Sequence, residues 1–340
     1  MNTNRCLIIA EAGVNHNGDI NLALDLISAA SKAGVDAIKF QTFRADALVT
    51  ANTNKANYQK QNTSVAESQR DMLRKLELSN KDHHTLIHAC KEHDLTFLST
   101  GFDTESLDFL ESTGMPIYKI PSGELTNLPL LRQIAGYNKP VILSTGMANI
   151  SEIAQSLDAL EQAGMQRKHI TLLHCTTQYP TPMENVNLRA MLTLGETFQD
   201  IQIGYSDHTL GIEVPIAAVT LGAQVIEKHF TLDRNMEGPD HSASLEPQEL
   251  QAMVQSIRNI EQAMGDGNKE PCSAELETRA VARKAIVASK PIQKGEIFSS
   301  TNLTVKRSGG GISPMLWDKL INQTASRSFE ADEAIDHSMS

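Results

Sequence analysis

The stretch CLIIAEAGVNHNGDINLALDLISAASKAGVDAIKFQT, residues 6–42, contains two short apolar runs that each end in polar side chains. The first run ends at Glu11 and the second at Gln41. Between them, Asp19 is a candidate helix cap, apolar side chains recur at helical spacing, and Gly34 is a candidate stop. The stretch therefore predicts a strand, an amphipathic helix and a second strand, which together form one βαβ unit.

The same transition from an apolar run to charged or hydroxyl side chains occurs eight times between residues 6 and 230. The polar residues at these ends are Glu11, Lys39, Gln41, Ser99, Thr100, Lys119, Ser122, Ser144, His174, Ser206, His208, Glu227 and His229. A stretch that can form a helix follows each of the first seven runs. Because this alternation indicates parallel strands joined by right-handed helical crossovers, it predicts an α/β fold, a (β/α)8 TIM barrel of about 250 residues.

One connection breaks the pattern of short loops. Residues 43–80 form a long polar insertion after the second strand. Because connections of that length in a compact domain are often functional, we expect a lid-like element here.

The composition changes after the last helical pattern of the barrel. The segment GDGNKEPCSAE, residues 265–275, is polar and rich in helix breakers, which is typical of a linker. Short β-type runs separated by turn residues follow it. We therefore expect a TIM-barrel catalytic domain at residues 1–265, a linker at 266–280, and a small, mostly β domain at 281–340.

The chain carries 30 lysines and arginines against 41 acidic residues, a net charge of -11, and has no dense basic run. A nucleic-acid partner is therefore not expected.

The four cysteines of the chain show neither zinc-site spacing nor a disulfide framework, which favours a reducing cytoplasm. The N-terminus lacks the apolar core of a signal peptide, and no later segment is a long apolar run, so neither export nor a membrane partner is expected.

Alternation along each strand decides which polar side chains meet, because neighbouring residues point to opposite faces. Lys39 shares a face with Gln41, and Glu227 shares a face with His229. Apolar neighbours suit the helix layer, so we expect the polar sets to point toward the barrel axis. Barrel enzymes catalyse reactions at the carboxyl ends of their strands, which is where these residues lie.

The residue types at the strand ends indicate one kind of ligand. Those that could surround an anion carrying phosphate and carboxylate groups are Lys39, Thr100, Lys119, Ser122, Ser144 and Ser206. His208 and His229 could bind a divalent metal, and Glu11 could act as a base. Each residue alone would more often be solvated or structural, but their occurrence together favours an active site at the carboxyl ends of the strands. The predicted ligand is a small phosphorylated acid.

Two other groups of residues are interpreted as structural. Cys175 follows His174 directly, and adjacent strand residues face opposite ways, so a cysteine hydrolase is not expected. One expected helix contains His83, His84, His88 and His93. We interpret it as an ordinary helix with a solvent-exposed face rather than a metal site.

Eight motifs occur in order along nearly the whole chain: AEAGVNHNG, IKFQT, YKIPSGE, ILSTGM, LHCTTQYPTP, GYSDHT, EKHFTLD and GPDHSAS. In this the chain resembles the bacterial sialic acid synthase family. That family condenses phosphoenolpyruvate with an N-acetylated mannosamine-type sugar, giving a nine-carbon 2-keto acid and phosphate by C–O cleavage. Its barrel is followed by a domain similar to type III antifreeze proteins. The resemblance therefore implies a nonulosonic acid synthase whose residues 281–340 form an antifreeze-like (SAF) domain.

The resemblance also implies roles for individual residues. Those expected to bind phosphoenolpyruvate are Lys39, Thr100, Lys119, Ser144 and Ser206. Those expected to hold the sugar are Gln41, Glu124, Tyr179 and Asp240. Glu11 matches the catalytic glutamate, and His208 and His229 match the ligands of manganese or magnesium. The metal would polarise the sugar aldehyde, and Glu11 would direct water to the coupled intermediate.

In the family that the chain resembles, a domain-swapped homodimer places the tail of one subunit over the active site of its partner. By position, the arginine that contacts the N-acetyl group there is Arg307. The usual Lys-Arg-Pro-Gly is here Lys306-Arg307-Ser308-Gly309. Because proline fixes φ, serine at position 308 leaves the backbone next to Arg307 less restrained, and the orientation of the Arg307 side chain depends on that backbone.

Other functions remain open from the residues alone. A barrel aldolase would bind pyruvate as a Schiff base on Lys39 or Lys119, without metal. A non-catalytic binding protein would keep only the fold, which the intact set of polar strand ends argues against. Within the family, AEAGVNHNG and FLSTGFD favour the branch that makes N,N'-diacetyllegionaminate from 2,4-diacetamido-2,4,6-trideoxymannose over the branch that makes N-acetylneuraminate from N-acetylmannosamine.

Overall fold

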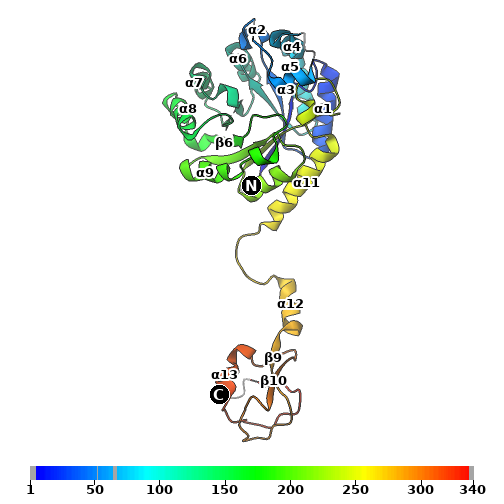
Figure 1. Ribbon diagram of the computed structural model, residues 1–340, viewed down its shortest axis with the longest axis vertical. Coiled ribbons are helices and arrows are strands. Elements are labelled where there is room, and N and C mark those ends of the chain that lie inside the picture. The colour runs from blue at the N-terminus through cyan, green and yellow to red at the C-terminus, as the bar shows by residue number, and fades with distance from the viewer. Residues whose placement is uncertain (1–4, 52, 64–66, 337–340) are drawn as a thin grey trace. The chain divides into compact units, whose positions relative to one another are not determined.

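The computed structural model describes residues 5–51, 53–63 and 67–336, and Figure 1 shows its elements. The barrel strands are β1 (Leu7–Gly13), β2 (Ala37–Thr42), β3 (Thr96–Gly101), β4 (Tyr118–Ile120), β5 (Val141–Ser144), β6 (Ile170–Cys175), β7 (Gln202–Asp207) and β8 (Val225–His229). All pair in parallel in the order β3-β2-β1-β8-β7-β6-β5-β4, and β3 lies next to β4, so the barrel is nearly closed. The predicted TIM barrel is confirmed.

Helices follow the strands and pack on the outside of the barrel. They are α1 (Ile20–Ala33), α5 (Asn80–Glu92), α6 (Thr104–Ser112), α7 (Leu128–Gly136), α8 (Ile150–Gln162), α9 (Arg189–Thr197), α10 (Glu213–Thr220) and α11 (Pro247–Ala263). Single 3₁₀ turns are η1 (Ser122–Glu124), η2 (Arg167–His169), η3 (Met183–Asn185) and η4 (His241–Ala243). Helix α1 has the predicted ends, because Asp19 accepts a hydrogen bond from the Asn21 backbone and Gly34 has a φ of +82°. Within the described ranges, no helix is both long and apolar enough to cross a bilayer.

The described part of the polar insertion, residues 43–51, 53–63 and 67–80, contains three short helices before α5 begins. These are α2 (Ala45–Leu48), α3 (Asn57–Asn62) and α4 (Gln69–Leu76). A small apolar cluster, separate from the main core, joins α4 to the barrel. Its buried members are Val14, Phe43, Met72 and Leu76. The Asn62 side chain donates to the carbonyl oxygen of Pro239 (3.0 Å), which ties α3 to the chain that follows β8.

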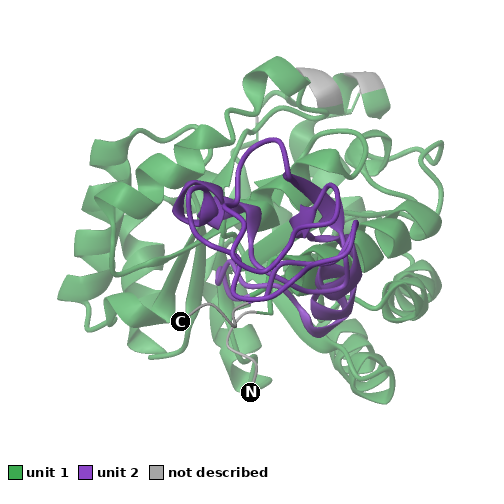
Figure 2. Cartoon of the chain, turned by 90° about the horizontal axis from the view of Figure 1, so that it is seen from below, with its two compact units in different colours: residues 1–265 green, residues 266–340 purple. Residues whose placement is uncertain are grey.

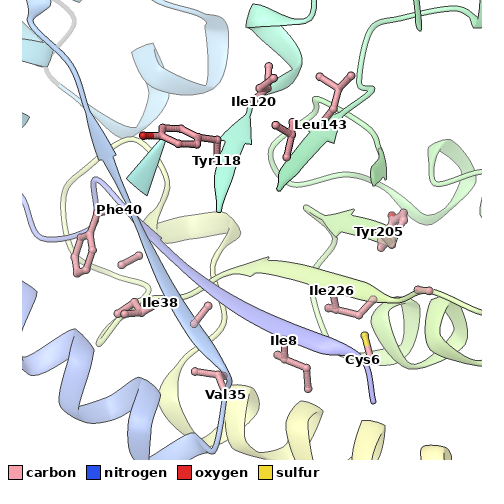
Figure 3. Packing of buried hydrophobic residues seen from close by; sticks show 14 of the residues in the cluster. Cys6, Ile8, Val35, Ile38, Phe40, Tyr118, Ile120, Leu143, Tyr205 and Ile226 are labelled. Carbon is pink, nitrogen blue, oxygen red and sulfur yellow. The ribbon is translucent and has the colours of Figure 1, made fainter. Parts of the chain in front are cut away.

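Alternation along the strands produces two apolar layers. Outward-facing side chains such as Ile8, Ile38 and Ile226 pack in the main core between strands and helices, part of which is shown in Figure 3. The inner layer fills the barrel, and its buried members are Ile9, Ala37, Leu98, Ile142, Leu173 and Val225. Each of these residues lies two positions before a side chain at the carboxyl end of its strand. An apolar layer inside the barrel therefore lies directly beneath the side chains at the carboxyl ends of the strands.

The chain divides into two compact units, residues 1–265 and 266–340, which are coloured separately in Figure 2. The second unit contains α12 (Ser273–Ala282), the antiparallel strands β9 (Lys284–Ala288) and β10 (Leu303–Arg307), η5 (Pro314–Leu316) and α13 (Trp317–Leu320). It has its own core, which includes Ile286, Phe298 and Phe329. Helix α12 lies largely inside residues 266–280, the segment expected to be a linker, and Glu275 caps it by accepting a hydrogen bond from the Cys272 backbone.

Candidate active site

A cavity of about 480 Å³ lies at the carboxyl ends of the barrel strands. This volume is typical of a small-molecule site. The predicted site residues that line it are Glu11, Lys39, Gln41, Thr100, Lys119, Ser122, Ser144, Tyr179, Ser206, His208, His229 and Asp240. Residues far apart in the sequence therefore meet in one cavity, while the role of each residue stays a prediction.

Two predicted site residues are not among those lining the cavity. Glu124, the last residue of η1, accepts a hydrogen bond from the side-chain amide of Asn127 (2.6 Å). Arg307 ends β10 in the second unit, where its side chain is exposed. A role for either residue in ligand binding stays a prediction.

Two lysines and two glutamates form a buried charge cluster in the cavity. The Lys39 Nζ atom lies 2.6 Å from Glu11 Oε2 and 3.7 Å from Glu227 Oε2. The Lys119 Nζ atom lies 3.1 Å from Glu227 Oε1. All four side chains are buried. Because buried charges are tolerated only when they are paired, this cluster holds both ammonium groups at defined positions.

Strand register brings these side chains together. Glu11 lies opposite Lys39 of β2 and opposite His229 of β8. Gly13, at a register shift in β1, has a φ of +52°, and a Cβ there would lie 3.2 Å from Gln41 Nε2. Glycine therefore leaves room for the Gln41 amide to donate a hydrogen bond to Glu11 (3.1 Å).

The two carboxyl groups differ in acidity. Burial raises the pKa of Glu11, against the opposing attraction of Lys39. Burial also disfavours the ionised form of Glu227, but Lys119 and Lys39 outweigh it and lower its pKa to about 2. For Lys39, burial is likewise outweighed, because the two carboxylates raise its pKa. Glu227 is thus a permanent negative charge, and Glu11 is the carboxyl better suited to proton transfer.

Hydroxyl groups surround the two lysines. Thr100 Oγ1 accepts a hydrogen bond from Lys39 Nζ (3.0 Å), and Ser206 Oγ donates one to Glu227 (3.0 Å). Ser144 Oγ is buried and makes no hydrogen bond with any residue that the structure describes. A buried hydroxyl without a partner is costly, so Ser144 marks a position where a ligand oxygen would bind.

The two histidines of the cavity are neutral and close together. The ring centroids of His208 and His229 lie 5.4 Å apart, and the Tyr179 ring centroid lies 4.2 Å from that of His208. Burial lowers the pKa of His208 to about 4 and the pKa of His229 well below its usual value. His208 Nδ1 donates to the carbonyl oxygen of Thr176 (2.7 Å), so its Nε2 keeps a lone pair. Asp240 Oδ2 lies 3.9 Å from His229 Nδ1.

This pair fits a divalent metal. Neutral imidazoles are common metal ligands, and a backbone acceptor on the other ring nitrogen, as at His208, fixes the tautomer that binds. The His229 Nδ1 atom is buried and has no hydrogen-bond partner in the described part of the chain. The described residues contain no cluster of three or more His, Cys, Asp or Glu ligands. Water or substrate would complete the coordination, as in catalytic rather than structural sites.

A buried ion pair ties together the two strand ends that carry the histidines. Lys228 Nζ lies 2.5 Å from Asp207 Oδ2 and also donates to the carbonyl oxygen of Thr209. Both charged side chains are completely buried. Because Asp207 precedes His208 and Lys228 precedes His229, this contact restrains both histidines from the outer side of the strands.

Sequence reasoning assigns no role to two parts of the cavity. One part is Glu227, which is the counter-ion of both Lys39 and Lys119. Its alternation with His229 along β8 indicated that its side chain points toward the barrel axis. The other part is an apolar side formed by the insertion, which includes Met72 and Leu73. Helical periodicity predicts only which face of α4 is apolar, so no sequence signal placed these residues beside the strand ends.

The residues interpreted as structural have partners of their own. Cys175 Sγ lies 3.2 Å from Ser122 Oγ and burial raises the pKa of its thiol, whereas His174 bonds to a backbone carbonyl (2.9 Å). Helix α5, with His83, His84 and His88 and with His93 at its C-cap, has a solvent-exposed face, and of these four histidines only His83 is buried. It is fully buried, and its Nε2 lies 2.7 Å from Thr42 Oγ1, because this position faces the barrel.

Comparison with known proteins covers both units. The model of the NeuB family matches residues 26–269, and the model of the SAF domain matches residues 283–339. Over 331 residues the chain is 53% identical to N,N'-diacetyllegionaminic acid synthase of Campylobacter jejuni, covering 97% of this chain and 99% of that protein. The protein of the same name from Legionella pneumophila is 46% identical, with 96% and 92% covered.

A solved structure resembles the chain as well. It is that of N-acetylneuraminic acid (sialic acid) synthetase from Leptospira borgpetersenii, in complex with citrate. The two are 35% identical and superpose with a TM-score of 0.72 over 82% of this chain and 93% of that one.

Proposed function

The chain belongs to the NeuB family, and we propose that it joins phosphoenolpyruvate to 2,4-diacetamido-2,4,6-trideoxymannose, giving N,N'-diacetyllegionaminate and phosphate. It is an enzyme that forms a carbon–carbon bond between phosphoenolpyruvate and an amino sugar. The observation that carries the choice of sugar is the 53% identity, over almost the full length, to a synthase named for that product. The sialic acid synthetase of known structure is only 35% identical.

The buried lysines are suited to hold phosphoenolpyruvate. Lys39 and Lys119 supply positive charge, and Thr100, Ser144 and Ser206 supply hydroxyl groups around them. An anion with phosphate and carboxylate groups gains most from such donors where water is excluded. Cys6, Cys90, Cys175 and Cys272 are free thiols, as in a reducing compartment, so we propose the cytoplasm as the site of the reaction.

His208 and His229 would hold a manganese or magnesium ion. When bound, the metal would act as a Lewis acid on the aldehyde of the open-chain sugar. The protein keeps both imidazoles neutral by burial. Gln41, Tyr179 and Asp240 line the cavity and would orient the sugar beside them.

The chemical steps use the chain's own groups in order. The methylene carbon of phosphoenolpyruvate attacks the aldehyde carbon, and positive charge develops on the carbon that carries the phosphate oxygen. Water adds there and gives one proton to Glu11, which passes it to the former aldehyde oxygen, so that this oxygen becomes a hydroxyl and Glu11 is ionised again. The tetrahedral species then expels phosphate by carbon–oxygen cleavage, and the remaining proton of the added water leaves with the phosphate as the C–OH becomes a ketone. Lys39 and Lys119 stabilise the negative charge of the departing phosphate.

The contacts of the lysines weigh against a Schiff-base aldolase, which needs an uncharged amine. Glu11 and Glu227 raise the pKa of Lys39, and Lys119 lies 3.1 Å from Glu227. These contacts favour ammonium groups that bind an anion. A binding protein without activity would have no need for Glu11, a buried carboxyl group whose raised pKa suits proton transfer.

We also propose that the chain works as a domain-swapped homodimer in which Arg307 of one subunit reaches the N-acetyl group in the site of the other. The backbone after Arg307 is restrained although the family's proline is replaced. Ser308 Oγ donates to the carbonyl oxygen of Gly310 (2.5 Å), and Gly309 has a φ of +74°. This hydrogen bond stands in for the proline ring in holding the turn.

The test is phosphate release from phosphoenolpyruvate with manganese, comparing 2,4-diacetamido-2,4,6-trideoxymannose with N-acetylmannosamine at equal concentrations. We expect faster turnover of the diacetamido sugar and complete loss of turnover when a chelator removes the metal. Faster turnover of N-acetylmannosamine would identify a neuraminate synthase instead. Metal-independent activity with pyruvate, together with a Schiff base that borohydride traps, would instead support the aldolase hypothesis.

The roles of His229 and Glu11 are tested by His229→Ala and Glu11→Gln. We expect each variant to lose a factor of about 10² to 10⁴ in turnover, because each removes a group that acts in the transition state. His88→Ala is the control, since His88 is exposed on α5. Near-normal turnover in both site variants, with folding intact by circular dichroism, would refute the assignment.

A further inference from the structure

One side of the active-site cavity comes from the insertion rather than from the strands. Helix α4 contributes Met72, Leu73 and Leu76, and the end of α2 contributes Leu48 and the following Val49. These five residues are called the insertion wall below. Met72 and Leu76 are 4% and 6% exposed, and the others are half-buried. Packing of α4 against Val14 and Phe43 holds the wall in place.

The strand side of the same cavity is polar. It carries the lysine and glutamate cluster and the two histidines. Phosphoenolpyruvate needs the lysines, and the aldehyde carbon of the sugar must lie beside its methylene carbon. The sugar therefore binds with C1 toward the strand ends and with C4 to C6 farthest from them.

The apolar side chains that line the cavity differ in how far they are shielded from water. On the side of β5, Met147 lines the cavity but is 73% exposed, so that side is open to water. On the side of the insertion, the wall is apolar and largely shielded. The insertion side can distinguish a methyl group from a hydroxyl group, whereas water competes with any contact made beside Met147.

We propose that the insertion wall is the specificity element for the sugar, receiving its C6 methyl group and the methyl of its C4 acetamido group. This inference rests on the proposed function and names the residues that select its substrate. Gln59 and Gln69 line the cavity on the same side, with Gln69 Nε2 3.4 Å from Gln59 Oε1. Their amides supply polar partners for the acetamido N–H and C=O groups at the edge of an apolar surface.

The selection follows from desolvation. N-acetylmannosamine carries a hydroxyl group at C6 where the diacetamido sugar has a methyl group, and this hydroxyl loses water without gaining a partner when it presses against Met72 and Leu73. The diacetamido sugar places apolar methyl groups there and removes apolar surface from water. An apolar pocket rejects an added hydroxyl by about a hundredfold at most, so we expect a preference of roughly ten- to a hundredfold.

The experiment measures kcat/KM of the full-length enzyme for three sugars, each with phosphoenolpyruvate and manganese. They are 2,4-diacetamido-2,4,6-trideoxymannose, N-acetylmannosamine, and 2-acetamido-2,6-dideoxymannose, which separates the C6 methyl from the C4 acetamido group. The variants are Leu73→Gln, at a half-buried position that tolerates a polar side chain, and Met72→Gln with Met72→Leu as its conservative partner. Leu192→Gln is the matched control, because Leu192 is also a partly exposed leucine on a helix but does not line the cavity.

In Leu73→Gln and Met72→Gln we expect the preference for the diacetamido sugar over N-acetylmannosamine to fall about tenfold, with the KM for phosphoenolpyruvate unchanged. Met72→Leu and Leu192→Gln should keep the wild-type preference. An unchanged preference in both glutamine variants of the wall, or an equal fall in Leu192→Gln, would overturn the inference while leaving the proposed function intact. Failure of the wild-type enzyme to use the diacetamido sugar would instead refute the proposed function, and the inference with it.

Discussion

His16 is completely buried in the turn after β1, where its Nδ1 accepts a hydrogen bond from the Gly18 backbone (3.0 Å). Burial lowers the pKa of His16 to about 4. An unfolded chain protonates this histidine near its ordinary pKa, so acid favours unfolding. The contribution of the neutral His16 to the free energy of unfolding is fully present above about pH 6.5 and declines as the pH falls toward 4. The same neutral, buried state characterises the two histidines of the cavity.

We therefore predict that the free energy of unfolding falls between pH 7.5 and pH 5.0, with about 2 kcal/mol of the loss due to His16. The variant His16→Gln should be less stable at pH 7.5 but should show that much less pH dependence. Urea unfolding followed by far-UV circular dichroism is the measurement, because the single tryptophan, Trp317, lies in the second unit. Equal pH dependence in wild type and variant would contradict the prediction, and the exposed His88→Gln serves as the control.

At the scale of elements, helix α4 is placed by a close backbone contact with the turn after β1. Gly18 has a φ of +76°, and a Cβ there would lie 2.2 Å from the carbonyl oxygen of Lys75. No side chain fits between these two backbones without moving α4. Gly18, the last residue of the AEAGVNHNG motif, thus allows the close approach of α4, the helix that carries most of the insertion wall.

We predict that Gly18→Ala displaces α4 and raises the KM for the sugar about tenfold or more, with a smaller change in the KM for phosphoenolpyruvate. The strain at positive φ should also cost about 1 kcal/mol or more of stability. Gly34→Ala is the matched control, because Gly34 has a similar φ of +82° but a Cβ there would meet only Val254 at 3.7 Å. Comparable stability loss in both variants with an equal change in sugar KM would argue against docking by Gly18.

At the scale of the whole molecule, the two units have separate apolar cores, and the barrel unit contains all residues that line the cavity. Arg307 belongs to the other unit. If the tail acts on the partner's site, as proposed, a chain lacking Glu11 can supply a working tail to a chain lacking Arg307. Complementation between two inactive chains therefore tests the swapped dimer.

We predict that Glu11→Gln and Arg307→Ala chains, each poorly active alone, regain about a quarter of wild-type turnover when unfolded together and refolded as mixed dimers. The fraction follows because half of the dimers are mixed and each has one intact site. Phosphate release after refolding is the measurement, with each variant refolded alone as the control. Absence of any gain over the separate variants would exclude action of the tail in the partner's site.

The sequence by itself determined the parts that depend on local periodicity. Alternation along each strand separated Ile38 and Phe40 from Lys39 and Gln41, and the caps at Asp19 and Gly34 set the ends of α1. Repetition of such units determined the barrel, because parallel strands with helical crossovers have few other arrangements. The carboxyl-end location of the polar residues followed from the fold.

Only the tertiary structure decided which of these residues meet. Strand register and packing across the barrel set Glu227 between Lys39 and Lys119, and left Glu124 beside Asn127 outside the cavity lining. Docking of α4 brought the insertion wall into the same cavity. These contacts join residues that are distant in sequence, and their geometry depends on how whole elements pack, which no local pattern encodes.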